Sequence, residues 1–231
     1  MYKRQVRDLI LRRDNLIVMN TASKDNLDKM EKVSEEILGA LPSLENGAET
    51  YDFPEPEKNQ AVIVESSSQY TVAVSQLEAP EDFYGKYFPF ISAISDRYIV
   101  PKLRFQGGAY SADAGYSSDM TKIVTYSYRD PNAKETIDII KGEADYLESM
   151  ELTQEDLDGY ILSTYSVVTG PEGNLEKHMT AMEYHMYGFD TAGFLKQAAQ
   201  IKEASIEDKD QAADALRKLL EKATYVTTRC V

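Results

Sequence analysis

The sequence of 231 residues predicts an α+β domain, with a mostly antiparallel sheet of about six strands and helices packed on one face. Two observations predict this class. Strand-like stretches, rich in β-branched and aromatic residues, are grouped before residue 130, with one more near the C-terminus. Between residues 132 and 222 the apolar residues follow mainly the spacing of helices. The expected order is β-α-β-β-α-β-β-α-α-α-α-β, without an internal repeat.

The first residues predict the end of a helix. Val6, Leu9 and Ile10 have the spacing expected of its last turns. We therefore predict that residues 1–13 are the tail of a preceding helix and that residues 14–231 form a single α+β domain. Residues 1–5 are left out of the fold prediction, because they belong either to that helix or to a non-native start.

A strand, a helix and an exposed connection are expected next. The stretch "LIVM", residues 16–19, predicts a short strand. Ser23 is a candidate N-cap for a helix whose apolar spacing continues until Pro42 stops it. The run at residues 44–59 is rich in Pro, Glu and Gly and predicts an exposed connection, because strand-like segments follow it at once.

Two pairs of strands are predicted on either side of one helix. The stretches "AVIVES" and "YTVAVSQL" are separated by a serine-rich turn and predict two adjacent antiparallel strands. The apolar spacing between Tyr87 and Ile99 predicts a helix, in which Pro89 is tolerated only within the first turn. Residues 108–116 and 121–128 then predict a hairpin around "SSDM".

Two capping-box-like pairs predict the starts of helices in the C-terminal part. These pairs are Asn132 with Glu135 and Thr153 with Asp156. A Gly-Pro pair is expected to end the second of these helices. Two further helices and a final strand complete the prediction: residues 175–189, 205–222 and 224–228.

Composition excludes several classes of function. The formal net charge is −14 and no cluster of Lys and Arg is present, so a nucleic acid is not expected as a partner. The only cysteine is Cys230, which excludes a disulfide framework or a multi-cysteine metal site and favours a reducing, cytoplasm-like compartment. No apolar run approaches the roughly 20 residues of a membrane span. We therefore expect a soluble protein without a membrane partner.

The stretch "RFQGGAYSADAGY", residues 104–116, carries the candidate site. A straight strand would separate Arg104 from Tyr110 by roughly 20 Å, too far for one ligand. If Arg104 closes a helix and Gly107 and Gly108 turn the chain sharply into a strand, both side chains can converge. The arginine would then offer forked donors to a carbonyl or carboxylate, and the phenol a single hydrogen bond.

The same stretch also has a purely structural interpretation. Arg104 would complement the C-terminus of a helix, the two glycines would form an ordinary turn, and Tyr110 would be half-buried in the sheet. Taken alone, the residues fit this interpretation at least as well.

Longer motifs carry a resemblance to a known family. "KLRFQGGAYS", followed by "VTYSYRDPN" and a helix, resembles the C-terminal part of the presequence-protease and falcilysin branch of the insulinase and pitrilysin zinc metallopeptidases. "RRDNLIVMNTAS" resembles that family's entry into its last domain, and "EASIEDKDQAADAL" resembles its closing helix. The resemblance covers most of the chain. Ser111 departs from the glycine expected after the tyrosine.

The resemblance implies a function for the whole protein. In that family two homologous halves close around an unfolded peptide, and the zinc site lies in the N-terminal half. The implied partners are that half and an unstructured peptide, and the implied location is the bacterial cytoplasm or an organelle matrix. Arg104, Tyr110, Gly107 and Gly108 would orient the substrate backbone. The alternative is a non-catalytic structural or binding protein on the same fold.

No metal site is expected in this chain itself. The family's zinc signature, His-x-x-Glu-His, is absent, and the only two histidines are His178 and His185. On one helix they would lie two turns, about 10 Å, apart, which is too far for one zinc ion. We expect this chain alone to bind no zinc and to cut no peptide. The nearby methionine stripe favours core packing over a peptide-binding surface: Met179, Met182 and Met186.

Overall fold

The computed structural model describes residues 2–43, 51–54, 57, 59–117 and 119–230. Most of the connection predicted at residues 44–59, and part of the predicted "SSDM" turn, lie outside the described residues. The chain forms two compact units, the first made of Met1–Glu55 and Glu172–Phe189, the second of Pro56–Pro171 and Asp190–Val231. The second unit contains the sheet and the candidate site.

Unit 1 is helical. Its elements are α1 (Tyr2–Ile10), η1 (Arg13–Asn15), α2 (Lys24–Gly39) and α7 (Asn174–Tyr187). The helix predicted after Ser23 is confirmed, although the Ser23 side chain makes no cap hydrogen bond. The strand predicted at residues 16–19 is wrong: this stretch has no regular structure. A strand requires a neighbour to pair with, and no strand is described in unit 1.

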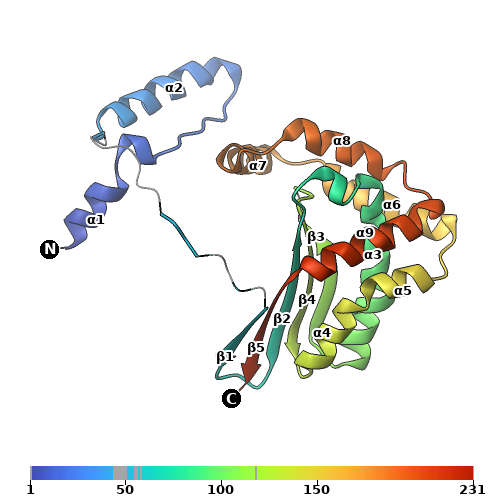
Figure 1. Ribbon diagram of the computed structural model, residues 1–231. Helices are drawn as coiled ribbons and strands as arrows, with labels where there is room; N and C mark the ends of the chain where they lie inside the picture. The colour runs from blue at the N-terminus through green and yellow to red at the C-terminus, as the bar shows by residue number, and fades with distance from the viewer. Residues whose placement is uncertain (1, 44–50, 55–56, 58, 118, 231) are drawn as a thin grey trace. The chain divides into compact units, whose positions relative to one another are not determined.

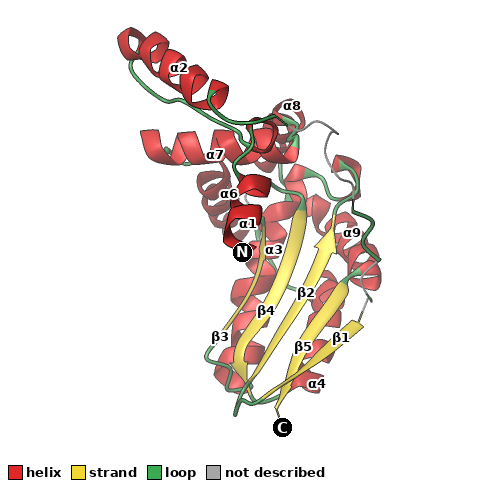
Figure 2. Ribbon diagram, turned by 90° about the vertical axis from the view of Figure 1, so that its left-hand side faces the viewer, coloured by secondary structure: helices red, strands yellow, loops and turns green. Residues whose placement is uncertain are grey.

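Unit 2 contains a five-stranded sheet in the order β1-β5-β2-β4-β3 (Figure 2). Its strands are β1 (Asn59–Val64), β2 (Gln69–Gln76), β3 (Ser111–Tyr116), β4 (Lys122–Asp130) and β5 (Thr224–Cys230). Only the β1–β5 pair is parallel, so the prediction of a mostly antiparallel sheet is confirmed. The predicted hairpin of β3 and β4 is also confirmed.

Two predictions about the strands are wrong. The sheet has five strands rather than about six, because the stretch at residues 16–19 does not join it. β1 and β2 are not adjacent either, since β5 pairs with both and separates them. A pairing between segments more than 150 residues apart leaves no local signal, whereas a serine-rich turn between two strand-like stretches imitates a hairpin.

Helices cover one face of the sheet, as predicted (Figure 1). A continuous helix runs through α3 (Phe88–Ile94) and η4 (Ser95–Gln106), with Pro89 in its first turn. η4 is a widened π-helix that accommodates Pro101. The remaining elements are η2 (Pro80–Asp82), η3 (Gly85–Tyr87), α4 (Ala133–Lys141), α5 (Glu143–Ser149), α6 (Gln154–Thr169), α8 (Thr191–Ile201), η5 (Ile206–Asp208) and α9 (Lys209–Lys222).

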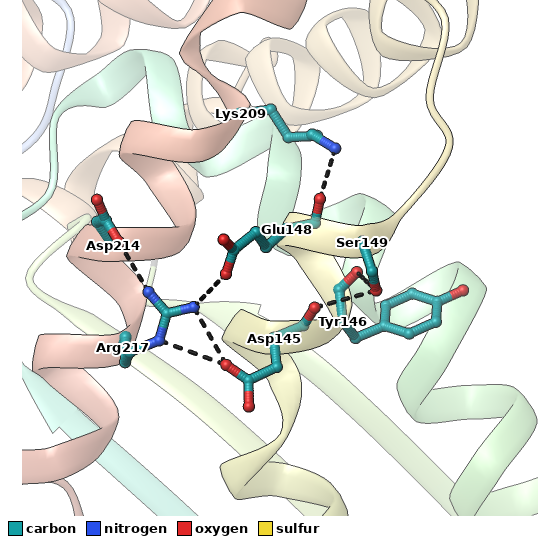
Figure 3. A network of polar contacts seen from close by, with 7 residues as sticks. All are labelled: Asp145, Tyr146, Glu148, Ser149, Lys209, Asp214 and Arg217. Carbon is teal, nitrogen blue, oxygen red and sulfur yellow. Dashed lines mark hydrogen bonds and ion pairs between the residues drawn. The ribbon is translucent and has the colours of Figure 1, made fainter.

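The helix predictions differ in detail from the structure. Thr153 and Asp156 form the predicted capping box at the start of α6, which ends at Gly170. α8 was not predicted, because the loop before it interrupts the apolar spacing. α5 and α9 pack side by side and are joined at the surface by Arg217, which pairs with three carboxylates (Figure 3): Asp145, Glu148 and Asp214.

The face under the helices contains buried polar groups among small apolar ones. Glu143, at the start of α5, is fully buried, and neither of its carboxyl oxygens has a hydrogen-bond partner. Burial raises the pKa of Glu143 to about 8, because the nearby Thr125 hydroxyl offsets little of the cost of a buried charge. Burial also raises the pKa of Tyr225 to about 12. Glu143 is therefore mostly protonated in the folded protein at neutral pH.

Candidate functional site

The helix formed by α3 and η4 ends in a tight glycine turn. The N–H of Gly107 donates to the Lys102 carbonyl at 2.9 Å, and the N–H of Gly108 donates to the Arg104 carbonyl at 3.2 Å. Gly108 has φ +82°, a conformation that favours glycine. A Cβ on Gly107 would lie 2.7 Å from the Leu103 carbonyl oxygen. Both glycines are thus required by the local geometry of the turn.

This turn separates the two predicted donors. Arg104 is an exposed residue in the last turn of η4, and Tyr110 directly precedes β3, where its N–H donates to the Tyr128 carbonyl at 3.0 Å. The Tyr110 side chain is 68% exposed, so it is not part of the core. Among the described residues, no hydrogen bond or ion pair engages the Arg104 guanidinium, which lies over the neighbouring Phe105 ring. Their convergence on one ligand stays a prediction.

The loop between β4 and α4 holds the glycine turn in place through a side-chain hydrogen bond. The buried carboxylate of Asp130 accepts hydrogen bonds from the Asn132 N–H, at 2.8 Å, and from the Thr136 hydroxyl. The Asn132 side-chain amide donates to the Gly107 carbonyl at 2.7 Å. α4 begins directly after Asn132, as predicted, but the Asn132 side chain does not cap the helix, because it holds the turn instead.

An aromatic cluster extends the site across this end of the sheet. We define it as Tyr70, Tyr110, Tyr128 and Arg129. Tyr70 and Tyr128 are cross-strand partners with ring centroids 5.0 Å apart, and the Tyr110 ring lies 6.1 Å from that of Tyr128. The Arg129 guanidinium lies over both rings, 5.8 Å from the centroid of Tyr110 and 5.6 Å from that of Tyr128. Sequence reasoning missed Arg129 and the use of Tyr70.

The helices of unit 2 pack on one face of the sheet, and we call the opposite face the open face. The aromatic cluster lies at the end of the open face. Along β2 and β4 the buried residues alternate with partly exposed ones, and Tyr126 and Tyr128 belong to the second set. The two tyrosines therefore lie on the open face rather than in the core.

The histidines and the methionine stripe belong to unit 1, whereas the candidate site belongs to unit 2. His178 shares a hydrogen bond of 2.6 Å with the Thr21 hydroxyl through its Nδ1 atom. Across the described part of the chain, no group of three His, Cys, Asp or Glu side chains has the arrangement of a metal site. Core packing is the wrong prediction for Met179 and Met186, because their side chains are 53% and 50% exposed.

Comparison with known proteins identifies the family. Residues 61–228, more than half of the chain, match the family model described as "PreP C-terminal domain". The chain belongs to this family of presequence-protease C-terminal domains. The match spans the glycine turn, Arg104, Tyr110 and the aromatic cluster. The predicted resemblance is therefore confirmed.

Relatives in several organisms agree with this assignment. The chain is 25% identical over 224 residues to presequence protease 1, chloroplastic/mitochondrial, of Arabidopsis thaliana, covering 96% of this chain and 21% of that protein. It is 22% identical to the protein HypA of Clostridium perfringens, covering 94% of this chain and 22% of that protein. A mitochondrial presequence protease of Xenopus tropicalis is 36% identical over 83 residues, 36% of this chain and 8% of that protein.

Solved structures share the fold. The inactive peptidase M16 domain of Pseudomonas fluorescens matches 88% of this chain and 51% of its own, with a TM-score of 0.57 at 16% identity. A protease of Helicobacter pylori matches 91% of this chain and 53% of its own, with a TM-score of 0.58 at 16% identity. Pitrilysin matches 90% of this chain and 23% of its own, with a TM-score of 0.54 at 12% identity. These similarities confirm the α+β class.

Two further facts bound the assignment. The chain spans about a fifth of the length of the first two curated relatives. Among the residues that the structure describes, no helix is long and apolar enough to cross a membrane.

Proposed function

We propose that this chain is the C-terminal, substrate-enclosing domain of a zinc-dependent metalloendopeptidase that degrades unstructured peptides. Membership of the presequence-protease family supports the class of enzyme, and the curated relatives, of which the chain spans about a fifth, support its place as one part of a longer protein. The partner is then the N-terminal catalytic half. The chloroplastic or mitochondrial location in the name of the Arabidopsis thaliana relative supports an organelle matrix, and the bacterial cytoplasm is the alternative location.

The observation that carries the proposal is the pair of free donors around the glycine turn. Arg104 and Tyr110 are both exposed, and the turn between them is fixed by the φ of Gly108 and by the hydrogen bond from Asn132. In the assembled enzyme these two side chains donate hydrogen bonds to the substrate backbone near the bond to be cut. Donors fixed in place before reaction stabilise the charge that develops on the carbonyl oxygen.

Zinc belongs to the other half in this proposal. The donors of this chain do not fit the ion, because His178 and His185 lie on one helix about two turns apart and no third ligand joins them among the described residues. The contribution of this chain is to bind and orient the peptide. The chemistry of hydrolysis is supplied by residues outside it.

The test is the kinetics of Tyr110→Phe in the full-length protein. This change keeps the ring and removes only the hydroxyl, so we expect kcat/KM for an unstructured peptide to fall on the order of 100-fold, with zinc content unchanged. Tyr84→Phe is the matched control, because Tyr84 is a partly exposed tyrosine outside the aromatic cluster. It should change kcat/KM by less than about twofold.

Two outcomes contradict the proposal. We call Arg104 and Tyr110 together the clamp. If kcat/KM of Tyr110→Phe stays within about twofold of the wild type, the tyrosine is structural and its proposed role in the clamp is wrong. If the full-length wild type binds peptides and cuts none, the alternative of a non-catalytic binding or structural protein on the same fold replaces the peptidase.

A further inference from the structure

Arg129 has an unusual backbone conformation. It has φ +50°, and the only other described non-glycine residue with positive φ is Met120. The left-handed region is unfavourable for an arginine, because its Cβ lies too close to the backbone carbonyl oxygen there. Such a conformation persists only where the surrounding structure enforces it, and it is a reason to look for function.

The conformation redirects the Arg129 side chain. In a regular strand, successive side chains point to opposite faces, so Arg129 would point away from the face of Tyr128. Instead its guanidinium lies over the rings of both Tyr128 and Tyr110. The turn of the backbone at the end of β4 thus brings a cation to the tyrosine of the proposed clamp.

The Arg129 guanidinium contacts two aromatic rings, but no acidic side chain among the described residues neutralises its charge. The adjacent Asp130 is buried and already accepts hydrogen bonds from Asn132 and Thr136. Arg129 is exposed, and no hydrogen bond of the described residues engages its N–H groups. Arg129 therefore presents a fork of donors to solvent beside Tyr110.

Because a free guanidinium fork matches the geometry of a carboxylate, we propose that Arg129, supported by Tyr110 and Tyr128, forms a carboxylate-binding subsite beside the proposed clamp. The carboxylate is that of an acidic side chain or of the C-terminus of the peptide. This inference rests on the proposed function, since it takes the peptide to pass Tyr110. In a chain of net charge −14, such a subsite counteracts the general repulsion of acidic peptides.

The experiment compares matched peptides on variants of the full-length protein. In a series of peptide pairs, the two members differ only by Glu or Gln at one position, and that position moves along the unstructured peptide from pair to pair. In one further pair, the two members differ only by a C-terminal carboxylate or amide. The wild type should prefer the carboxylate member of one pair by about 5- to 10-fold in kcat/KM, less at high salt. Arg129→Gln should reduce this ratio to about one, and Arg129→Lys should keep only part of it, because lysine lacks the fork.

The controls separate this inference from the proposed function. Lys122→Gln removes an exposed cation at the other end of β4 and should leave the ratio unchanged. Tyr110→Phe should lower kcat/KM for both members of a pair by a similar factor. Binding of the same peptides to protein treated with a chelator, followed by fluorescence anisotropy, measures the preference without cleavage. A ratio that is equal in the wild type and Arg129→Gln, in both cleavage and binding, would overturn the subsite.

Discussion

The two faces of the sheet have opposite chemistry. Under the helices, the strands place small and polar side chains that are fully or almost fully buried: Thr71, Ala73, Ser75, Ala112, Ala114, Thr125 and Ser127. Larger buried side chains of this covered face include Ile123 and Tyr225. The open face carries valines and tyrosines that are partly exposed, among them Val72, Val74 and Tyr126.

The difference shows what each face is built to contact. Small side chains let the helices approach the sheet closely. Two of their hydroxyls have partners, since Thr71 bonds Thr227 at 3.0 Å and Ser75 bonds the Leu219 carbonyl at 3.3 Å, whereas the Ser127 hydroxyl has none among the described residues. On the open face, tyrosines keep apolar rings available together with a polar tip. The open face is thus suited to contact another surface or a peptide, and its end carries the proposed clamp.

The largest effect on stability is expected for Glu143, which is fully buried at the start of α5, on the side of the sheet that the helices cover. Burial raises the pKa of Glu143 in the folded protein from the ordinary 4.5 to about 8, so between these pH values the unfolded chain releases a proton that the folded chain retains. The contribution of Glu143 to the free energy of unfolding is therefore full below about pH 4.5 and falls as the pH rises, by about 1.4 kcal/mol per unit, until about pH 8. Glu143→Gln should remove this fall.

Denaturant unfolding of the chain at several pH values measures the effect. Glu203→Gln is the matched control, because Glu203 is exposed, and it should keep the pH dependence of the wild type. If Glu143→Gln showed the same slope as the wild type between pH 5 and 8, the covered face would not contain a protonated carboxyl group.

A smaller effect is expected at the glycine turn between η4 and β3. Gly108→Ala places a Cβ at φ +82° without a clash, since the nearest atom, the Pro131 Cγ, would be 3.7 Å away. The cost is then conformational, about 1 kcal/mol of the free energy of unfolding. Gly115→Ala, where a Cβ meets nothing within 4 Å and φ is not positive, should be close to neutral in the same assay. Equal effects would show that the turn is not constrained.

The sequence contains much of the fold in local signals. Periodicity and caps predict the hairpin of β3 and β4, the helix that begins at Thr153, and the turn at Gly107 and Gly108, because each depends on residues close together in the chain. The glycine turn in particular follows from the Gly-Gly pair between a predicted helix and a predicted strand. These are the signals on which the candidate site was found.

The remaining features depend on contacts between distant segments. The insertion of β5 between β1 and β2 joins residues more than 150 positions apart. Asn132 has the spacing of a cap, yet tertiary structure uses its amide to hold Gly107. The sequence predicts an ordinary strand residue at Arg129 and does not indicate its positive φ. The extent of the single domain predicted at residues 14–231 likewise stays a prediction, since the family match covers residues 61–228.

The central claim is that Arg104 and Tyr110 hold the same stretch of peptide backbone. A crystal structure of the full-length protein with an uncleaved peptide tests it most directly. We predict that the Tyr110 hydroxyl and the Arg104 guanidinium both lie about 2.7 to 3.2 Å from oxygen atoms of the peptide backbone near the bond to be cut. A peptide bound in the closed protein with either side chain turned to solvent would contradict the claim.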